Sequence, residues 1–430
     1  MTAVLVMLGS FLIILILGVP IGISMAIAGM VTILSTGSAT SYFQALAQKM
    51  YTGIDSFALL AIPFFLLAGN IMNQGGISKR LVEFFRLILR RVPATTAVIT
   101  TITSAFFGAL TGSSPATVAA VGGMTVPTML KNGYTKEDAS AVAAASGILG
   151  PIIPPSITMI TFAVTASISI STMFLAGIVP GLMLALGFVI VEILCHTKYE
   201  KGEKTKLQKG ELFHAFKNAV WALGMPVIIL GGIYGGIFTP TEAAAVSCIY
   251  ASVVSVFVYR EVRPGDLVKM FYDSVKNTAQ IMFILCLASG YAWLMANFGI
   301  IKVISGVIIG LGNKFLILLT VNVILLILGC FIDATSIIIL VTPIMLPVAD
   351  TLGIHYIALG LMMCVNVACG ALTPPLAPNL YVAGNIAGTR SIVGITKAVL
   401  PLLAVAVIVL LILTYVPETT LFLPRILGLL

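Results

Sequence analysis

The chain has 430 residues, of which 59% are hydrophobic and only 9% are charged, and its mean hydropathy is +1.14. Soluble domains carry about 25% charged residues, so this composition excludes a soluble globular fold and predicts an all-α polytopic membrane protein. The net charge of +8 does not point to a nucleic-acid partner, because basic residues in membrane proteins mainly encode orientation.

The apolar segments predict a series of spans. The first, at 3–34, is too long for a cleavable signal and is expected to be a retained helix bent near Pro20. Residues 77–91 alternate basic and apolar positions as a helix in the membrane interface does, and 197–211 form the long polar linker. Further spans are expected near 54–74, 173–196, 218–236, 241–259, 276–297 and 391–416.

Four segments are interrupted where a spanning helix would be continuous. TGSSPAT (111–117) divides 93–130 and FIDATS (331–336) divides 314–349, which predicts two re-entrant helical hairpins. The segments 137–171 and 355–389 are too long for one crossing of about 20 residues. They are interrupted by GILGPIIPPSI (147–157) and GALTPPLAPN (370–379), which predicts two broken helices.

The two halves of the chain are related by a shift of 220 residues. This shift places Pro127, Gly133, Gly150 and Pro154–Pro155 on Pro347, Gly353, Gly370 and Pro374–Pro375. We therefore predict a first repeat at 1–217, a linking transmembrane helix at 218–240 and a second repeat at 241–430. Counting 3–34 as one crossing gives an odd number of crossings between the repeats, so the second repeat is expected to be inverted.

The basic residues provide a separate test of orientation. With the N-terminus in the cytoplasm and the C-terminus in the periplasm, 19 of the 23 Lys and Arg residues fall on the cytoplasmic side. This bias agrees with the positive-inside rule. The first hairpin is then expected to open from the cytoplasm and the second from outside.

The hairpin tips and helix breaks combine polar groups with an absence of cations. No Lys or Arg lies in 101–130, 138–175, 315–350 or 356–389. Freed carbonyls and hydroxyls suit a hard cation such as Na⁺, and half-helix N-termini favour anionic groups. A carboxylate substrate without a basic partner then requires a co-bound cation. Ser113, Ser114 and Thr117 could instead simply close a turn, and Asp333 could instead cap a helix.

Three other features have simpler explanations. Glu242 follows Pro240 and is expected to cap its helix, and Glu192 is expected at the interface. The six Cys residues have no CxxC spacing and suit apolar packing. Paired Asp, Ser–His and HExxH motifs are absent from the spans, so we do not expect an enzyme.

Four motifs together resemble the large membrane (M) subunit of tripartite ATP-independent periplasmic (TRAP) transporters, and the resemblance covers essentially the whole chain. They are FFGALTGSSPATVAAVG (106–122), GILGPIIPPSI (147–157), GGIYGGIFTPTEAAAV (231–246) and GALTPPLAPNLYV (370–382). The resemblance implies an elevator-type, Na⁺-coupled importer of an organic acid, of C4-dicarboxylate or sialic acid type, in the bacterial inner membrane. It also implies a small four-helix membrane subunit and a periplasmic substrate-binding protein as partners.

The resemblance also implies roles for particular residues. One Na⁺ site would include Ser113, Gly147 and Gly150, and the other Asp333, Gly370 and Thr373. The polar candidates near the substrate are Ser114, Thr117, Ser156, Thr335 and Asn379. The alternative function is a stand-alone Na⁺-coupled dicarboxylate or ion carrier of similar architecture, which would need no binding protein.

Overall fold

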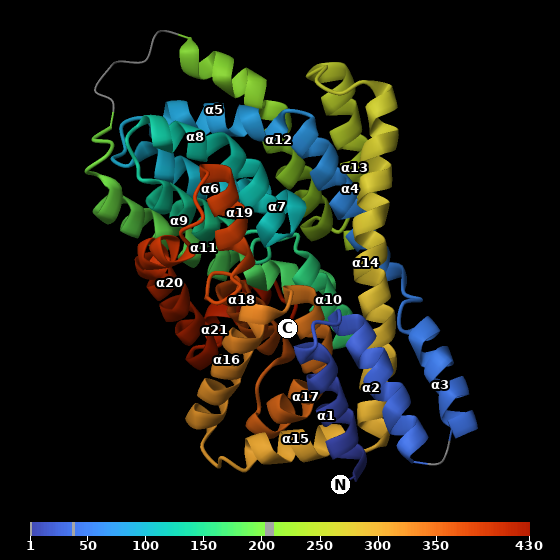
Figure 1. Cartoon of the computed structure of the whole chain (residues 1–430). Coiled ribbons are helices and arrows are strands. Elements are labelled where there is room, and N and C mark those ends of the chain that lie inside the picture. Colours follow the sequence, from blue (N-terminus) through green and yellow to red (C-terminus); the bar gives the residue numbers. More distant parts are fainter. Residues whose placement is uncertain (1, 37–38, 203–209) are drawn as a thin grey trace.

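The computed structural model describes residues 2–36, 39–202 and 210–430. These residues form helices joined by short loops, and no strand occurs among them (Figure 1). Eight of the helices are long and apolar enough to cross a membrane. Residues 203–209 of the polar linker predicted at 197–211 lie outside the described residues, which resume at Gly210.

The first half of the chain contains the elements that precede this linker. In order they are α1 (Thr2–Ile16), α2 (Ile21–Ser35), α3 (Ala39–Thr52), the 3₁₀ turn η1 (Phe57–Leu60), α4 (Ala61–Gln74), α5 (Ile77–Leu89), α6 (Thr95–Thr111), α7 (Ser114–Thr117), the π-helical turn η2 (Val118–Gly122), α8 (Gly123–Lys131), α9 (Lys136–Gly147), α10 (Ile157–Thr165) and α11 (Ile170–His196).

The second half contains a matching series. In order it comprises α12 (Glu211–Tyr234), α13 (Pro240–Val253), the π-helical turn η3 (Val254–Val258), α14 (Pro264–Asn297), α15 (Ile300–Ile309), α16 (Lys314–Phe331), α17 (Ala334–Leu352), α18 (Tyr356–Gly370), α19 (Pro378–Ala387), α20 (Ile392–Tyr415) and α21 (Glu418–Ile426).

The shift of 220 residues relates elements along nearly the whole chain. It places α6 on α16, α9 on α18, α10 on α19 and α11 on α20, each within three residues at both ends. The two hairpins are α6 to α8 and α16 to α17, and the two broken helices are α9–α10 and α18–α19. The predicted fold class, with a hairpin and a broken helix in each repeat, is confirmed.

The two repeats are inverted relative to each other. The same shift relates α5 to α15, and these two helices lie crosswise at opposite ends of the molecule (Figure 1). The first hairpin starts at the end that carries α5, where Ala94 N donates to Glu200 O at 2.8 Å. The second hairpin starts at the end that carries α15. We call the α5 end the basic face and the α15 end the opposite face.

The prediction of one bent helix at 3–34 is wrong. The chain leaves helical geometry at 17–20, with Gly18 at φ +84°, and α2 packs back against α1. Pro20 has no N–H and fixes its own φ, so it ends a helix as readily as it bends one. The start of α1 therefore lies beside α15 at the opposite face (Figure 1). The prediction of a single crossing had placed it on the same side of the membrane as most of the basic residues.

The scaffold around α14 shows how the repeats interlock. This helix of 34 residues, about 51 Å at 1.5 Å per residue, runs from the basic face to the opposite face. Its counterpart in the first repeat is split into α3 and α4 near Gly53. α2 of the first repeat packs along the second half of α14, and α4 of the first repeat packs along α13. The 220-residue shift relates α2 to α13 and α4 to the second half of α14, so the two contacts are equivalent.

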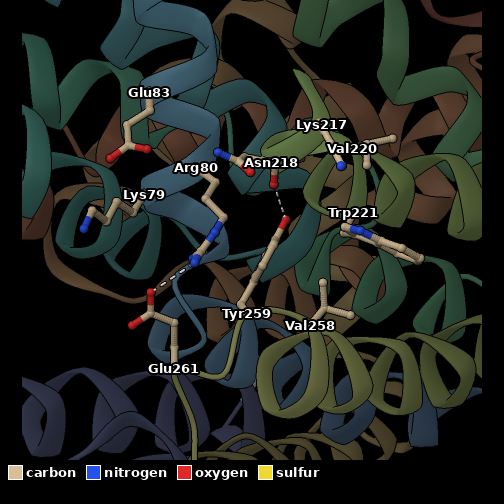
Figure 2. Close-up of a pocket in the computed structure, with 10 residues that line it drawn as sticks. All are labelled: Lys79, Arg80, Glu83, Lys217, Asn218, Val220, Trp221, Val258, Tyr259 and Glu261. Carbon is tan, nitrogen blue, oxygen red and sulfur yellow. Dashed lines mark hydrogen bonds and ion pairs between the residues drawn. The ribbon is translucent and has the colours of Figure 1, made fainter. Parts of the chain in front are cut away.

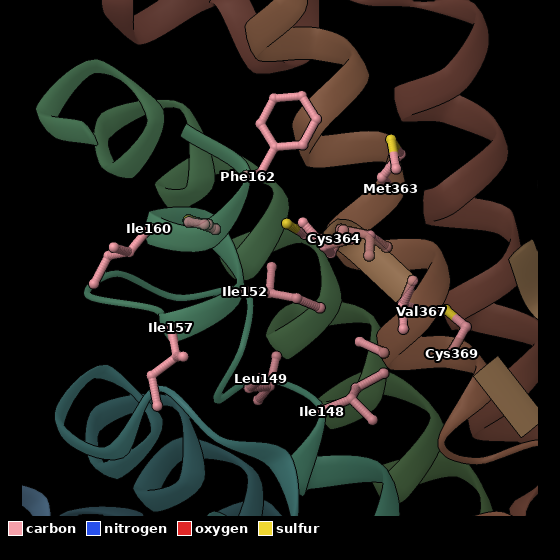
Figure 3. Packing of buried hydrophobic residues seen from close by; sticks show 14 of the residues in the cluster. Ile148, Leu149, Ile152, Ile157, Ile160, Phe162, Met363, Cys364, Val367 and Cys369 are labelled. Atoms are coloured by element: carbon pink, nitrogen blue, oxygen red, sulfur yellow. The ribbon is translucent and has the colours of Figure 1, made fainter. Parts of the chain in front are cut away.

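The two broken helices meet at the centre of the molecule. Figure 3 shows Ile148, Leu149 and Ile152 of the first break beside Cys364, Val367 and Cys369 of α18. All of these side chains are buried, which agrees with the expectation that the cysteines serve as packing residues. Apolar packing thus holds the two helix breaks side by side.

Candidate functional site

The tip of the first hairpin lies against the start of α10. Gly112 ends α6 at φ +60°, and Ser113 then returns the chain to extended geometry before α7. A Cβ atom on Gly112 would lie 2.9 Å from Ile157 N and 3.2 Å from Pro155 O. Only glycine allows both this backbone conformation and this close approach. The tip therefore touches the first helix break directly.

Five of the predicted site residues come together at this contact. A Cβ atom on Gly150 would lie 2.9 Å from Ser113 O and 2.7 Å from Thr117 Oγ1. One on Gly147 would lie 3.2 Å from Ser114 O. Thr117 Oγ1 donates to Ser113 O at 2.8 Å. The structure thus groups the predicted Na⁺ ligands Ser113, Gly147 and Gly150, and it adds Thr117, which the resemblance had assigned to substrate.

Asn379 connects this tip to the second repeat. Its Nδ2 atom donates to Ser114 Oγ at 2.5 Å and to Ala144 O at 3.2 Å. The side chain is buried, and its Oδ1 atom has no hydrogen-bond partner among the described residues. Two predicted substrate residues, Ser114 and Asn379, are therefore in direct contact, with one acceptor still free.

Ser156 has a local role in the structure. Its Oγ atom accepts from Met159 N at 3.3 Å and donates to Pro151 O at 2.6 Å. It therefore caps α10 and closes the loop that precedes it. This side chain is buried beside Gly112 but makes no described contact with Asn379 or Ser114.

The second tip is built differently. Asp333 is exposed and caps α17, accepting from Ser336 N at 2.9 Å and from Ser336 Oγ at 2.5 Å. Thr373 Oγ1 donates to Cys369 O at 3.0 Å, and Gly370 packs against Gly329. The structure gives no polar contact that joins Asp333 to Gly370 or Thr373. Thr335 lies on the first turn of α17, half-buried.

The chemistry at the first tip suits a hard monovalent cation. The oxygen atoms at this tip are the Ser113 and Ser114 carbonyls and the Thr117 hydroxyl, which are ligands of the kind found in discontinuous helices of transporters. Ser113 O also accepts from Thr117 N at 3.1 Å and from Thr117 Oγ1 at 2.8 Å. The glycines allow the helix break to pack directly against the tip, because a Cβ atom on Gly147 would clash with Val118 Cγ2 and one on Gly150 would lie 2.7 Å from Thr117 Oγ1. Among the described residues, no cluster of three His, Cys, Asp or Glu side chains is arranged to hold a metal.

A polar cluster that the sequence did not predict lies behind this tip. Thr101 Oγ1 is 2.5 Å from Glu192 Oε1 and 2.8 Å from Ser146 Oγ, and all three side chains are buried. The expectation that Glu192 lies at the interface is wrong, because α11 turns this side chain toward α6 and α9. The sequence signal was an acidic residue within an apolar helix.

The second repeat contains a neutral counterpart. Asn366, which the 220-residue shift places on Ser146, donates to Asn322 Oδ1 at 2.7 Å. Asn322 in turn donates to Thr414 Oγ1 at 3.0 Å. In both repeats a polar cluster therefore joins the first hairpin arm, the broken helix and the long helix that follows.

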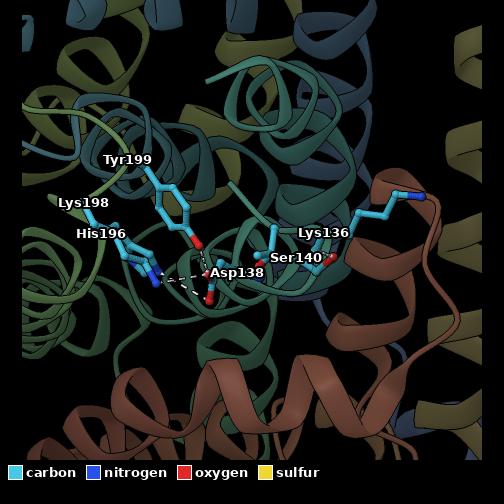
Figure 4. A network of polar contacts seen from close by, with 7 residues as sticks. Lys136, Asp138, Ser140, His196, Lys198 and Tyr199 are labelled. Atoms are coloured by element: carbon cyan, nitrogen blue, oxygen red, sulfur yellow. Dashed lines mark hydrogen bonds and ion pairs between the residues drawn. The ribbon is translucent and has the colours of Figure 1, made fainter. Parts of the chain in front are cut away.

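The basic face holds the base of the first hairpin. Glu200 accepts from Thr96 N and from Thr96 Oγ1, each at 2.7 Å, and so caps α6. Beside it, Tyr199 donates to Asp138 Oδ2 at 2.7 Å, with His196 and Lys198 around the same carboxylate (Figure 4). Burial raises the pKa of Tyr134, which stacks on Tyr199, so this phenol stays neutral.

A pocket of about 590 Å³ opens between α5, α12 and the segment after η3 (Figure 2). Arg80 binds Glu261 at 3.1 Å and lies 3.8 Å from the centre of the Tyr259 ring. Tyr259 donates to Asn218 O at 2.7 Å, and burial raises its pKa to about 12. These contacts join α5 to the scaffold. The predicted cap at Glu242 is confirmed as a capping box with Thr239.

Comparisons with known proteins agree with this architecture. Residues 8–419 match the family described as "Tripartite ATP-independent periplasmic transporter, DctM component". The chain is 37% identical to the C4-dicarboxylate TRAP transporter large permease protein DctM of Rhodobacter capsulatus, covering 99% of both. It is 32% identical to the sialic acid TRAP transporter large permease protein SiaM of Vibrio cholerae, covering 95% of both.

Two further similarities define the limits of the comparison. The chain is 40% identical to the isethionate TRAP transporter permease protein DctMQ of Oleidesulfovibrio alaskensis over 97% of its own length, but it spans only 66% of that relative. The crystal structure of the Alcanivorax borkumensis YdaH transporter matches with a TM-score of 0.63 at 14% identity, covering 89% of both chains. This last likeness concerns the fold alone.

Proposed function

Because the chain belongs to the DctM family of TRAP transporter large permeases, a family of transport proteins rather than enzymes, we propose that it imports an organic acid together with Na⁺. The observation that carries the proposal is the first hairpin tip. There, the Ser113 and Ser114 carbonyls and Thr117 Oγ1 face Gly147 and Gly150 across a glycine-lined contact, with no basic side chain in the surrounding segments.

In this proposal Na⁺ supplies the positive charge that the site lacks. Ser113, Gly147 and Gly150 would hold the ion, with Thr117 beside them. Ser114 and Asn379 would then bind an acidic substrate through hydrogen bonds, with Ser156 and Thr335 nearby. For the second ion, Asp333, Gly370 and Thr373 remain a prediction. The C4-dicarboxylate and sialic acid named for the relatives support an organic acid as the proposed substrate.

We place the basic face in the cytoplasm, following the positive-inside rule. This puts the start of α1, which lies at the opposite face, in the periplasm (Figure 1). It puts α21 on the same side, because Glu418 and Arg425 line a pocket with Lys314 at the base of the second hairpin. Residues 3–34 contain no Lys or Arg, so replacing the predicted crossing by the α1–α2 pair leaves the charge bias unchanged. The family implies the bacterial inner membrane.

We propose that transport proceeds by an elevator movement. The hairpins and broken helices would slide as one unit against a scaffold that includes α2, α4, α13 and α14. The domain division at 1–217, 218–240 and 241–430 remains a prediction. The 220-residue shift, which places α12 on α1 and α13 on α2, supports including α12 in the second repeat.

The proposed partners are a small four-helix membrane subunit and a periplasmic binding protein that delivers the substrate. The test is uptake into proteoliposomes that contain all three proteins. We expect Na⁺-dependent uptake that is abolished in Thr117→Val, which removes the hydroxyl ligand of the first site, and in Asp333→Ala. Undiminished uptake in both variants would contradict the proposed ion sites. Uptake of free substrate without the binding protein would instead support a stand-alone carrier.

A further inference from the structure

Glu192 is the only fully buried acidic side chain among the described residues. Its carboxyl group contacts Thr101 through Oε1, and its Oε2 atom has no hydrogen-bond partner. No Lys or Arg side chain makes a described contact with it. A buried charge without a cation and with a single hydroxyl partner costs several kcal/mol or more. This environment therefore favours the neutral carboxyl group.

Counting hydrogens leads to the same protonation state. Three contacts run in series: Glu192 to Thr101 at 2.5 Å, Thr101 to Ser146 at 2.8 Å, and Ser146 to Val142 O at 2.7 Å. A hydroxyl group has one hydrogen to donate and a carbonyl has none. Thr101 and Ser146 therefore supply two hydrogens for three contacts. A proton on Glu192 completes the series, because each group then donates to the next.

The neutral counterpart in the second repeat shows that packing alone does not require a carboxyl group here. Asn322, Asn366 and Thr414 join the equivalent three helices without an ionisable residue. The first repeat thus has a titratable group where the same construction is made elsewhere from amides and a hydroxyl.

Polar side chains lie between Glu192 and the basic face. His196 follows one helical turn later on the same side of α11, and residues four apart have Cβ atoms about 5–6 Å apart. The imidazole is buried, and its Nδ1 atom has no partner among the described residues. Its Nε2 atom lies 3.9 Å from Asp138 Oδ1, and that carboxylate is partly exposed (Figure 4).

The charged and titratable groups around this pair come from several elements. Tyr134 comes from the loop before α9, Asp138 from α9, and Lys198 from the segment after α11. Of the other helices that pack on α11, α6 and α10 contain no ionisable residue. The ionisable residues of α18, α20 and α21 make no described polar contact with Glu192. They are Tyr356, Cys364, Cys369, Lys397, Tyr415, Glu418 and Arg425.

We propose that Glu192 is a proton-binding site that exchanges its proton with the basic face through His196 and Asp138. This inference rests on the proposed transport function in one respect: Glu192 contacts Thr101 of the hairpin arm α6, which belongs to the unit that would move. The permease would then bind a proton in addition to its other ligands, and its transport cycle would respond to pH.

The transfer balances with groups present in the chain. The O–H bond of Glu192 breaks and an N–H bond forms at His196 Nδ1, directly or through one water, which leaves a carboxylate beside an imidazolium. His196 then releases its Nε2 proton to water beside Asp138. The transfer uses the tautomer with hydrogen on Nε2, which lies 3.9 Å from Asp138 Oδ1, while the ring stacks beside Tyr199. Reversal of these steps reloads Glu192.

The direct test is infrared spectroscopy of the purified permease in lipid nanodiscs. We expect a protonated-carboxyl C=O band at neutral pH that disappears in Glu192→Gln and persists in Glu418→Gln, which changes an exposed carboxyl group. Thr101→Val should shift the band by removing its hydrogen-bond partner. Gln can occupy the same space and donate to Thr101, so this variant should fold. A parent spectrum without the band overturns the proposal.

The second test is uptake as a function of external and internal pH in the three-protein proteoliposomes. We expect the rate to change by up to about tenfold per pH unit in the parent and by less than about twofold in Glu192→Gln. Thr414→Val, which alters the neutral cluster, should keep the parent's pH response. Unchanged pH dependence in Glu192→Gln contradicts the inference. A band without any Na⁺-dependent uptake points instead to a failure of the proposed function.

Discussion

The amide of Asn379 donates to the hydroxyl of Ser114 at 2.5 Å, although the two residues are 265 positions apart. This bond joins the break in the second repeat to the hairpin tip of the first repeat. It is the most direct polar link between the repeats at the centre of the molecule. A substrate held here would contact both repeats at once. Movement of one repeat would therefore disturb the contacts that the other repeat makes.

We expect Asn379→Leu to lower the free energy of unfolding by about 1–3 kcal/mol, because Ser114 and the Ala144 carbonyl lose a buried partner. The same change should abolish uptake. Thermal unfolding of the purified protein and uptake in proteoliposomes measure the two effects. Asn297→Ala is the matched control, since Asn297 is exposed and bonds only within its own helix. Full uptake by Asn379→Leu would remove this residue from the substrate site.

Glycine substitutions should separate close packing from helix propensity. We expect Gly150→Ala to destabilise the protein by about 1–3 kcal/mol through overpacking, because its Cβ atom would meet Thr117 Oγ1 at 2.7 Å. Gly123→Ala should be neutral or stabilising by up to about 1 kcal/mol, since that position is in a helix with open space around it. Equal melting temperatures for the two variants would contradict the close contact at Gly150.

Asp333 offers a way to distinguish capping from ion binding. Asn caps a helix about as well as Asp, so we expect Asp333→Asn to melt like the parent and Asp333→Ala to lose about 0.5–2 kcal/mol. If the carboxylate also binds Na⁺, Asp333→Asn should need a higher Na⁺ concentration for half-maximal uptake. The Na⁺ titration of uptake checks this. An unchanged titration would show that Asp333 acts only as a cap.

His355 should make stability depend on pH at the opposite face. Its Nδ1 atom accepts from Ile357 N at 3.2 Å and caps α18, which requires the neutral ring. Burial, together with the Arg425 charge, lowers the pKa of His355. The unfolded chain therefore takes up a proton at higher pH than the folded chain does. Stability should fall as pH drops below about 6.5, by at most about 1.4 kcal/mol per unit.

Thermal unfolding across this range tests the His355 prediction. The variant His355→Asn keeps a capping oxygen without a titratable ring, so its melting temperature should fall less than that of the parent. His214→Asn is the control, because His214 is exposed and lies on α12 at the basic face. A parent protein whose melting temperature stays the same as pH drops below about 6.5 would contradict the prediction.

The sequence predicted those parts of the fold that depend on local signals. The turn-forming motif TGSSPAT marks the first hairpin tip. Thr239 and Glu242 form a capping box within four residues. The breaks were visible because 137–171 and 355–389 are too long for one crossing. Pro20 was ambiguous, since the same residue can bend a helix or end it, and packing between α1 and α2 decided the outcome.

The parts that were missed depend on partners distant in the chain. Glu192 is surrounded in sequence by apolar residues near a helix end, which describes an interfacial position as well as a buried one. Its partner Thr101 is 91 residues away. The hydrogen bond of Asn379 to Ser114 is likewise set by how the repeats pack. The short crosswise helix α15 has Lys302 as its only charged residue, so it lacks the run of basic residues that marked α5 as an interfacial helix.

The split between α3 and α4 makes the two repeats unequal on the outside. α3 stands away from the bundle beside the second half of α14, with most of its described side chains exposed (Figure 1). The corresponding stretch of the second repeat is the unbroken first half of α14. The exposed surface of α3 therefore has no counterpart in the second repeat. Any protein that recognises α3 can therefore dock once per chain, and a complex built on that contact contains the two proteins in equal numbers.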